Sequence, residues 1–363
     1  MVAPRTPGVY IEEFHFASTP IQGVPTSTAG FIAVTGRGAL LGPLLSFADF
    51  EHLAIPNLGV NLPLAVRGFF ENGGQALYIS RIAPSDPLES GLAALDAQPI
   101  SIVCCPDDPT IPDAAASMAA HCATRKDRIC ILQSREPVIP VATHQPPVNS
   151  TYAAYYYPWI TVPSLDGSTT VTMPPGGHVA GIYAQTDTNR GVWSAPANLA
   201  LLGVTAVSEN VTDLESDQLN SRGIDLLRSF PAAGIIVWGA RTTTGEDSDW
   251  KYVSVRRLLI FIEQSVSQGI QWAVFEPNGP ALWAAVSSSV QNFLASLWKL
   301  GAFQGTTQQE AYFVRCDLTT MTQNDLDNGR LVCVVGVAPL RPAEFVIFQI
   351  AIWTQYPPNP PGK

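Results

Sequence analysis

Cysteine and histidine are the residue types most able to do chemistry in this sequence of 363 residues. The five histidines stand singly and far apart, and the six cysteines include no C-x-x-C pair, so their spacing does not support a zinc site. A nucleophile–base pair such as Cys104 with His178 has no local support in the sequence. Several cysteines lie in or next to apolar runs, as in ISIVCC, RICIL and RLVCVVGV, and we expect such thiols to be buried and reduced.

Motifs for nucleotide binding and hydrolysis are also missing from the sequence. Gly36-Arg37-Gly38 with Gly42 has the wrong spacing for a dinucleotide fingerprint, no glycine-rich loop ends in Gly-Lys-Ser/Thr, and there is no G-x-S-x-G motif. We therefore expect no cofactor, no metal and no enzyme activity. An α/β enzyme with an unrecognised active site remains the alternative.

Two acidic clusters have ordinary structural interpretations. Glu246-Asp247 with Asp249 comes just before a predicted helix, where acidic side chains favour the helix N-terminus. Asp325 and Asp327 precede Asn328-Gly329, a dipeptide that fits a tight turn into the next strand.

The composition points to a subunit of a larger assembly. Charged residues make up 14% of the chain, against about 25% in a typical soluble domain, so much of the surface must be apolar or neutral and available for interfaces. The net charge of −10 argues against nucleic-acid binding. No uninterrupted apolar run is long enough to insert into a membrane, and the N-terminus lacks an apolar signal core, so we expect the chain to be made and kept in a cytoplasm until release.

Apolar runs of strand length alternate with helical patterns, which predicts a mixed α/β fold. The segment 100–133 reads as strand, Ala-rich helix and strand, and it resembles a βαβ unit. Loops rich in Pro and Gly are predicted at 136–150 and 163–178, on either side of an aromatic segment. Strands are predicted at 30–35, 76–82, 100–105, 128–133, 234–239, 271–275, 311–316, 330–337 and 344–356, and helices at 113–124, 248–269 and 281–301.

The two ends of the chain carry the most unusual patterns. Near the start, GVYIEEF reads as a short strand and is followed by a connector that contains Pro20, Gly23 and Pro25. Near the finish, EFVIFQIAIWTQY is apolar on both faces and much longer than the mean strand of about five to six residues. An uncovered terminal strand of this kind would aggregate, so it is either central in its own sheet or covered by another chain.

The sequence resembles the sheath proteins of contractile phage tails and phage-like injection particles. The similarity begins with TPGVYIEE and PIQGVPTSTAGFIAVTGRG and continues in order through YYPWITV, GIDLLRSFPAAGIIVWGART, WKYVSVRRLLIFIEQSV, LVCVVGVAP and RPAEFVIFQI. It covers both ends and nearly all of residues 151–355, and it is weaker from about 84 to 150.

This resemblance implies a structural subunit that polymerises in helical rings around an inner tube and contracts, without nucleotide, to drive the tube through a target envelope. It implies a core of mixed sheets with flanking helices, an N-terminal exchange arm (1–22), a first core part (23–150), a second core part (151–343) and a C-terminal strand with a Pro-rich tail (344–363). The implied partners are further copies of the chain, the inner tube protein, baseplate and tail-terminator or cap proteins, and paralogous sheath subunits. Assembly would take place in the bacterial cytoplasm, and the product would be a phage tail or a released particle.

The implied interface residues lie in and beside the two arms, whose strands would pair with a neighbouring subunit. The arginines next to the predicted late strands would hold carboxylates across or near that interface. The arm residues are Val9, Tyr10, Ile11, Phe345, Val346, Ile347, Phe348, Ile350 and Ile352, and the further candidates are Arg330, Arg341 and Glu344.

Overall fold

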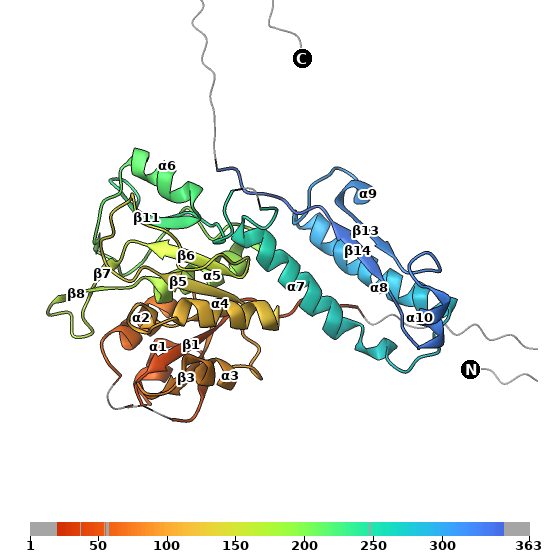
Figure 1. Ribbon diagram of the computed structural model, residues 1–363, viewed down its shortest axis with the longest axis horizontal. Helices are drawn as coiled ribbons and strands as arrows, with labels where there is room; N and C mark the ends of the chain where they lie inside the picture. Colours follow the sequence, from red (N-terminus) through yellow and green to blue (C-terminus); the bar gives the residue numbers. More distant parts are fainter. Residues whose placement is uncertain (1–19, 37, 54, 56–57, 247, 345–363) are drawn as a thin grey trace, which may run out of the picture.

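The computed structural model describes residues 20–36, 38–53, 55, 58–246 and 248–344. These residues form a larger part built on one wide sheet and a smaller, mostly helical part beside it (Figure 1). The long helix α7 (Val253–Gly269) begins against the larger part and leads into the smaller one. The predicted mixed α/β class is confirmed.

The wide sheet has nine strands, and its centre is parallel. Strands β3, β1, β4, β5, β6 and β11 pair in parallel, whereas β2, β12 and β9 are antiparallel to their neighbours at the two edges. The spatial order is β2 (Leu41–Leu44), β3 (Ala76–Ile82), β1 (Thr28–Val34), β4 (Ile102–Cys104), β5 (Ile129–Gln133), β6 (Ala153–Tyr157), β11 (Ile224–Phe230), β12 (Gly234–Trp238) and β9 (Leu199–Ala200). Since β5 and β6 are neighbours, the chain on both sides of residue 150 belongs to this one sheet.

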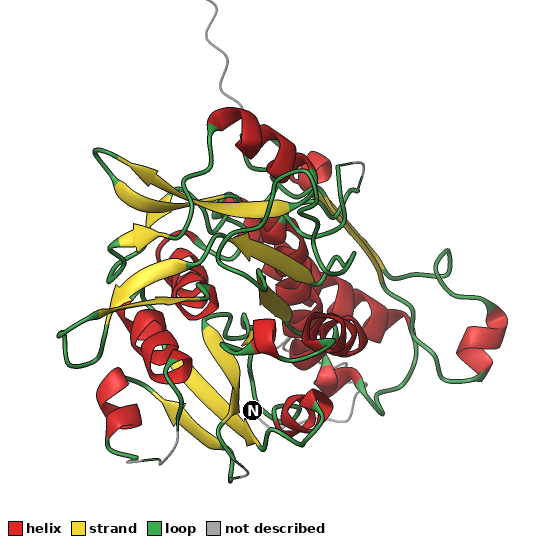
Figure 2. Cartoon of the chain, turned by 60° about the vertical axis from the view of Figure 1, so that its left-hand side comes forward, coloured by secondary structure: helices red, strands yellow, loops and turns green. Residues whose placement is uncertain are grey.

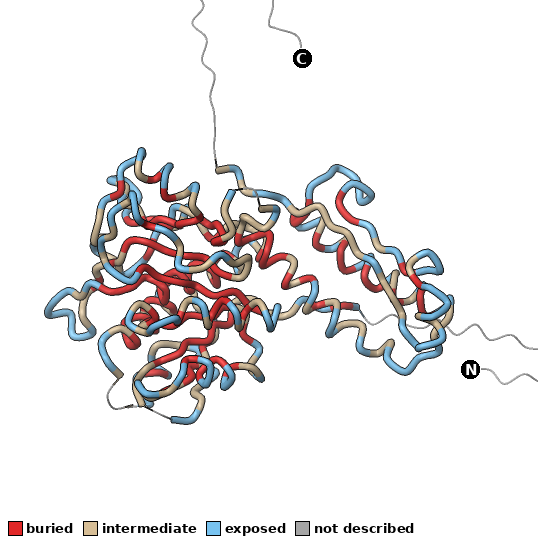
Figure 3. Tube along the Cα trace, in the orientation of Figure 1, coloured by how far each residue is buried: buried red, intermediate tan, exposed pale blue. Residues whose placement is uncertain are grey.

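Helices cover both faces of the sheet, which explains why its strands read as continuous apolar runs (Figures 2 and 3). Strand β1 shows the alternation, since Phe31 packs with α2 and α5 on one face and Ile32 packs with α3 and α4 on the other. The first pair of helices is α2 (Asn61–Glu71) and α5 (Gly176–Arg190), and the second is α3 (Leu88–Ala94) and α4 (Ala114–Arg125).

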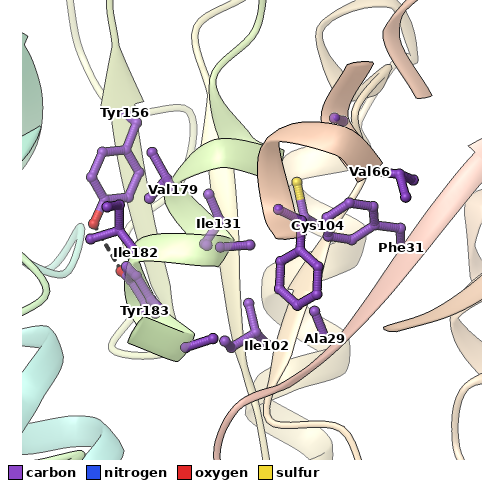
Figure 4. Packing of buried hydrophobic residues seen from close by; sticks show 14 of the residues in the cluster. Ala29, Phe31, Val66, Ile102, Cys104, Ile131, Tyr156, Val179, Ile182 and Tyr183 are labelled. Atoms are coloured by element: carbon purple, nitrogen blue, oxygen red, sulfur yellow. Dashed lines mark hydrogen bonds between the residues drawn. The ribbon is translucent and has the colours of Figure 1, made fainter. Parts of the chain in front are cut away.

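Close packing of α5 onto the sheet and onto α2 depends on small residues. A Cβ atom added to Gly177 would lie 2.5 Å from the carbonyl oxygen of Ala65 in α2. On the sheet side, Tyr183 of α5 reaches Tyr156 of β6, and their hydroxyl groups are 2.9 Å apart (Figure 4). These contacts fix α5 as one wall of the larger core.

The remaining elements of the larger part are short. They are α1 (Phe47–Glu51), the 3-10 turn Asp108–Thr110, the three-stranded sheet of β10 (Ala206–Val207), β7 (Ile160–Pro163) and β8 (Thr170–Met173), and α6 (Asp213–Ser221).

The smaller part has its own core between α7, α8 and a two-stranded sheet. Helix α8 packs Val290, Phe293 and Leu297 against α7 and against strand β13. The elements after α7 are the 3-10 turn Gln271–Ala273, α8 (Pro280–Lys299), α9 (Gln308–Ala311), β13 (Tyr312–Arg315), α10 (Gln323–Asp327) and β14 (Val334–Val337).

Most of the predicted elements are confirmed, including the βαβ unit, in which β4 and β5 pair in parallel on either side of α4. The predicted loop at 136–150 is also confirmed. Near residue 325, Thr322 and Asp325 form a capping box at the start of α10, which confirms the cap. The tight turn into the next strand is wrong, because Asn328 ends α10 with a φ of −94°, Gly329 follows it with a φ of +66°, and β14 begins only at Val334. The strand predicted at 344–356 lies almost wholly outside the described residues.

Four further expectations about local structure are wrong or only partly right. Residues 271–275 form no strand, because Gln271–Ala273 is a 3-10 turn that continues from α7, in which the N–H of Ala273 bonds back to Ile270 O. The strand predicted at 330–337 is shorter and covers Val334–Val337. The predicted loop at 163–178 contains β8 and the first turn of α5. Glu246 is not at a helix N-terminus, because it pairs with Arg241 and Lys251, and α7 has no acidic residue in its first turn.

Candidate assembly site: the roots of the chain ends and the small sheet

The first described residues of the chain lie along the C-terminal half of α7 (Figure 1). The backbone N–H of Val24 donates to Ser265 Oγ at 3.1 Å. A Cβ atom added to Gly23 would lie 2.6 Å from the ring of Phe261, so the chain can approach α7 this closely only with glycine there. At the end of α7 the helix supplies the glycine instead, and Ile21 packs over Gly269. We call residues 20–26 the N-terminal root.

A buried ion pair ties the N-terminal root to both parts of the molecule. Arg257 of α7 donates two hydrogen bonds of 2.6 Å to the Asp187 carboxylate of α5 and a third, of 3.0 Å, to the carbonyl oxygen of Thr26. Both charged side chains are almost fully buried, with 3% and 1% of their surface exposed. Burial raises the pKa of Asp187, and the Arg257 guanidinium acts in the opposite direction. The pair therefore depends on keeping both partners.

The last described residue of the chain is held at the other end of α7. Glu344 accepts hydrogen bonds from Arg241 Nε at 2.7 Å and Arg241 Nη2 at 2.6 Å, and from the Tyr252 hydroxyl at 3.1 Å. Arg241 follows β12, and Tyr252 directly precedes the first turn of α7. Burial lowers the pKa of the Arg241 guanidinium, but its hydrogen bonds and charge interactions with Glu344 and Glu246 together outweigh that effect and raise the pKa, so the group stays charged. We call residues 338–344 the C-terminal root.

A cavity of about 660 Å³ opens beside the C-terminal root. Its lining mixes apolar and charged side chains from the larger part, among them Trp193, Asp217 and Trp238, with Arg341 and Glu344 of the root. The ion pair between Arg341 and Asp249 nearby is exposed, so it contributes little to holding the root. Within the described residues, the Glu344–Arg241 contact anchors the end of this root, while backbone hydrogen bonds tie residues 338–340 to Ala302, Gln304 and Ala311.

The small sheet of β13 and β14 has two strands, and within the described residues no third strand pairs with it. One face packs on α8, while Phe313 on the other face is half exposed and lies over Gly336 of the partner strand. Two strands alone are marginal in water, and each leaves one edge of unpaired backbone groups. This sheet is therefore suited to accept further strands at either edge.

The structure places the predicted interface residues as follows. Arg330 pairs with Asp325 at 3.1 Å inside one helix–turn segment, and Arg341 pairs with Asp249 at 3.1 Å, so both partners are in the same chain. Glu344 is at the C-terminal root. The arm residues Val9, Tyr10, Ile11, Phe345, Val346, Ile347, Phe348, Ile350 and Ile352 lie outside the described residues.

Sequence reasoning missed the residues that anchor the roots, namely Arg241, Tyr252, Asp187 and Arg257. A signal was available for Arg257, since Arg256-Arg257 is a pair of charges inside an apolar helical stretch, and such buried charges need partners. Nothing in the sequence names Asp187 as that partner.

The Cys104–His178 pair does not have the geometry of a nucleophile with its base. Neither ring nitrogen of His178 has a hydrogen-bond partner among the residues that the structure describes. Burial, together with Arg67, lowers the pKa of His178 to about 3, and burial raises the pKa of the Cys104 thiol well above its usual value. Cys104 therefore stays a protonated thiol, and His178 stays neutral.

The described part of the chain contains no group of three or more Asp, Glu, His or Cys side chains arranged to hold a metal ion. None of its helices combines the length and the apolarity needed to cross a membrane.

Two family models together match most of the chain. The model of the phage tail sheath protein central domain matches residues 85–243, and that of the phage tail sheath C-terminal domain matches residues 245–352. The boundary between them falls just before α7, where the smaller part of the fold begins.

Several curated relatives are tail sheath proteins. Those of Vibrio phage KVP40 and Enterobacteria phage T4 are 24% and 22% identical over 177 residues, which cover 48% of this chain and 26% of each relative. That of Burkholderia phage BcepMu is 27% identical over 208 residues, covering 55% of this chain and 42% of the relative. The chain thus spans less than half the length of these relatives.

Three solved structures match almost end to end. A chain of the anti-feeding prophage (AFP) baseplate is 33% identical, covers 96% of this chain and 99% of its own, and has a TM-score of 0.76. The AFP helical sheath in its contracted state is 33% identical, with coverages of 96% and 99% and a TM-score of 0.79. The sheath of an extracellular contractile injection system (PVC), also contracted, is 29% identical, with coverages of 97% and 98% and a TM-score of 0.79.

Proposed function

Since the chain belongs to the phage tail sheath protein family, we propose that it is the structural subunit of a contractile sheath. Its copies polymerise in helical rings around an inner tube, and contraction of the sheath drives the tube through a target envelope. The energy comes from the difference between two lattices of the same chain, so the cycle has no catalytic step. The AFP and PVC sheaths, solved in the contracted state, match nearly the whole length of this chain and support this function.

The observation that carries the proposal is the small sheet, whose two edges pair with no further strand among the described residues, together with the two roots that are held on either end of α7. Arms from neighbouring copies add strands to β13 and β14, so that each copy gives two arms and receives two. Backbone hydrogen bonds supply the affinity, and the alternating side chains of the arms set the register. In the N-terminal arm these residues are Val9, Tyr10 and Ile11, and in the C-terminal arm Phe345, Val346, Ile347, Phe348, Ile350 and Ile352.

The rigid roots give this exchange a mechanical role. Because Arg257 and Arg241 anchor the two roots to the body of the subunit, a pull on either arm moves the subunit as a whole. Arms of fixed length then transmit rotation from one ring to the next. Arg330 and Arg341 flank the acceptor sheet and the C-terminal root, where we propose that they contact carboxylates of a neighbour in the assembled state.

Further partners follow from this role. The inner tube protein, baseplate proteins and a terminator or cap protein contact the sheath along its bore and at its ends, and paralogous sheath subunits share the lattice. A chain similar to this one is part of the AFP baseplate, which supports the baseplate contact. The subunit assembles in the bacterial cytoplasm and acts in a phage tail or a released particle.

Removal of the C-terminal arm tests the proposal. A chain that ends at Glu344 keeps the root and the acceptor sheet, so it should fold and stay soluble but form no tubes or rings in negative-stain micrographs at concentrations where the full chain does. Added to the full chain, it should shorten the tubes, because it can accept arms but cannot give its C-terminal arm. Truncated chain that unfolds at once would show that the strand serves its own subunit. Truncated chain that polymerises as the full chain does would show that the C-terminal arm is not needed for assembly.

A further inference from the structure

Cys316 and Cys333 face each other at the end of the small sheet. Arg315 of β13 is opposite Val334 of β14, so one step further along the same antiparallel register places Cys316 opposite Cys333. The two side chains belong to the same small cluster beside α8, and each thiol influences the pKa of the other. All six cysteines of the chain are free in this structure.

The hydrogen-bond pattern of the sheet identifies the kind of pair that these cysteines form. At the other end of the sheet the backbone N–H of Ala338 donates to Ala311 O, which makes 311 and 338 a hydrogen-bonded pair. Hydrogen-bonded and non-hydrogen-bonded pairs alternate along an antiparallel ladder, so Cys316 and Cys333 form a non-hydrogen-bonded pair. Their Cα atoms are then about 4.5 Å apart, within the range of about 4.4–6.8 Å that a disulfide spans. The spacing expected of such a pair therefore suits a disulfide.

The same two residues are accessible to a small oxidant. Cys333 is partly exposed, and Cys316 retains 8% of its surface. Both pack at the rim of a small apolar cluster that includes Trp283 and Val286 of α8. Burial raises the pKa of Cys316 to about 12 and also raises that of Cys333, so thiolate is scarce at neutral pH and the reaction accelerates as the pH rises.

A second thiol pair in the chain serves as a built-in comparison. Cys122 of α4 and Cys130 of β5 also lie close together, since burial and the Cys122 thiol both raise the pKa of Cys130, but both side chains are fully buried. An oxidant cannot reach them while the larger part is folded. Both cysteine pairs are close in space, but only Cys316 and Cys333 can be reached by an oxidant. Comparing the oxidation of the two pairs therefore separates the effect of proximity from the effect of accessibility.

We propose that Cys316 and Cys333 form an intrachain disulfide when the protein meets a small-molecule disulfide such as glutathione disulfide. The Cys333 thiolate attacks one sulfur of the oxidant, whose S–S bond breaks and releases one glutathione thiol. The Cys316 thiolate then attacks the Cys333 sulfur of the mixed disulfide and releases the second glutathione thiol. Two protein thiols are oxidised to one disulfide, the oxidant is reduced to two thiols, and these carry the two protons.

The bond would link β13 covalently to β14 at the end of the sheet nearest α10. It closes the loop that contains α10, so β13 and β14 could not separate at this end. In a reducing cytoplasm both residues stay thiols, and in an oxidising medium outside the cell the disulfide forms. The pairing itself does not depend on the proposed function, and its test needs no assembled sheath.

The test is treatment of the native full chain with glutathione disulfide at pH 7.5 and pH 9, followed by alkylation and peptide mass mapping. We expect one linked peptide pair that joins Cys316 to Cys333, formed faster at pH 9 and reversed by dithiothreitol, while Cys122 and Cys130 are alkylated as free thiols. In Cys316→Ser the bond cannot close, and Cys333 should instead carry one glutathione. Melting curves of both proteins before treatment verify that the variant is folded.

Two results would overturn the inference. One is a wild-type chain in which Cys316 and Cys333 stay reduced at pH 9 under conditions that oxidise the urea-unfolded chain. The other is a stable glutathione adduct on Cys333 of the wild type with no closure onto Cys316. Either result is independent of whether the chain forms tubes.

Discussion

Arg257 and Asp187 join the N-terminal root, α5 and α7 at a single buried point. Replacing Asp187 with Asn leaves the guanidinium buried without its counter-charge, so we expect the free energy of unfolding to fall by about 3–5 kcal/mol. Urea unfolding followed by tryptophan fluorescence measures this loss. The matched control is Asp249→Asn at the exposed pair with Arg341, which should cost less than about 1 kcal/mol. Equal, small losses in both variants would show that the buried pair does not hold the root.

His178 makes the stability of the larger part depend on pH. Its pKa is lowered from 6.5 to about 3 by burial and by Arg67, so below pH 6.5 the unfolded chain binds a proton here and the folded chain does not. The free energy of unfolding therefore falls as the pH falls towards 3, by about 1–2 kcal/mol between pH 7.5 and 5.5. His144, whose pKa is lowered to about 4, adds a second contribution of the same sign.

Urea unfolding of His178→Leu at the two pH values isolates this contribution. The variant should lose less stability between pH 7.5 and 5.5 than the wild type. An unchanged pH dependence in His178→Leu would show that the imidazole is not kept neutral by the fold.

Among the elements, the small sheet shows which backbone groups face a neighbour. The alternation of hydrogen-bonded pairs along β13 and β14 determines which N–H groups point into the ladder and which point to an open edge. The backbone N–H of Val334 points toward β13, and that of Val335 points to the open edge of β14. Val335→Pro should therefore remove one donor from the open edge, leave the β13–β14 ladder in place, and reduce or abolish tube formation. Val334→Pro is the matched control, because it breaks the ladder itself and should lower the melting temperature more. Full-length tubes from Val335→Pro would mean that arms do not add at the β14 edge.

Val314→Pro makes the corresponding change at the open edge of β13. Its effect on tube formation, compared with that of Val335→Pro, reports whether arms are received at both edges.

The sequence predicted elements better than it predicted anchors. Strands buried on both faces read as apolar runs, so β3, β4, β5 and β12 could be located, and α7 and α8 followed from their helical period. The apolar run at 271–275 misled because its residues turn away from the end of α7 without pairing. The residues that anchor the roots could not be predicted because their partners are distant in the sequence. Arg257 and Asp187 are 70 residues apart, and Arg241 and Glu344 are 103 residues apart. Such contacts depend on how the two parts pack, and a local pattern does not carry that information.

For the whole molecule, the rooted arms make the length of the connectors a mechanical variable. Residues 20–26 are fixed on α7, so inserting a few Gly and Ser residues immediately before Pro20 lengthens the free part of the connector and leaves the root intact. Particles should then assemble in the extended state but contract slowly or not at all. The reason is that a longer, loose connector does not transmit the rotation of one ring of subunits to the next. Time-resolved light scattering after triggering measures the rate.

The matched control places the same insertion between Asp166 and Gly167, in the exposed turn between β7 and β8. That change should leave contraction at its normal rate. A normal rate in the connector variant as well would show that the N-terminal arm serves assembly only and does not transmit rotation.

We propose that copies of this chain alone store and release the energy of contraction. Electron micrographs of assembled sheaths, recorded before and after triggering in EDTA and without any nucleotide, test this through the length and diameter of the sheaths. We expect long, narrow sheaths that become shorter and wider, with the same result for folded Cys104→Ser and His178→Ala variants. Sheaths that shorten only when ATP or a metal ion is added, or a full chain that stays monomeric at every concentration, would show that the energy does not come from this chain.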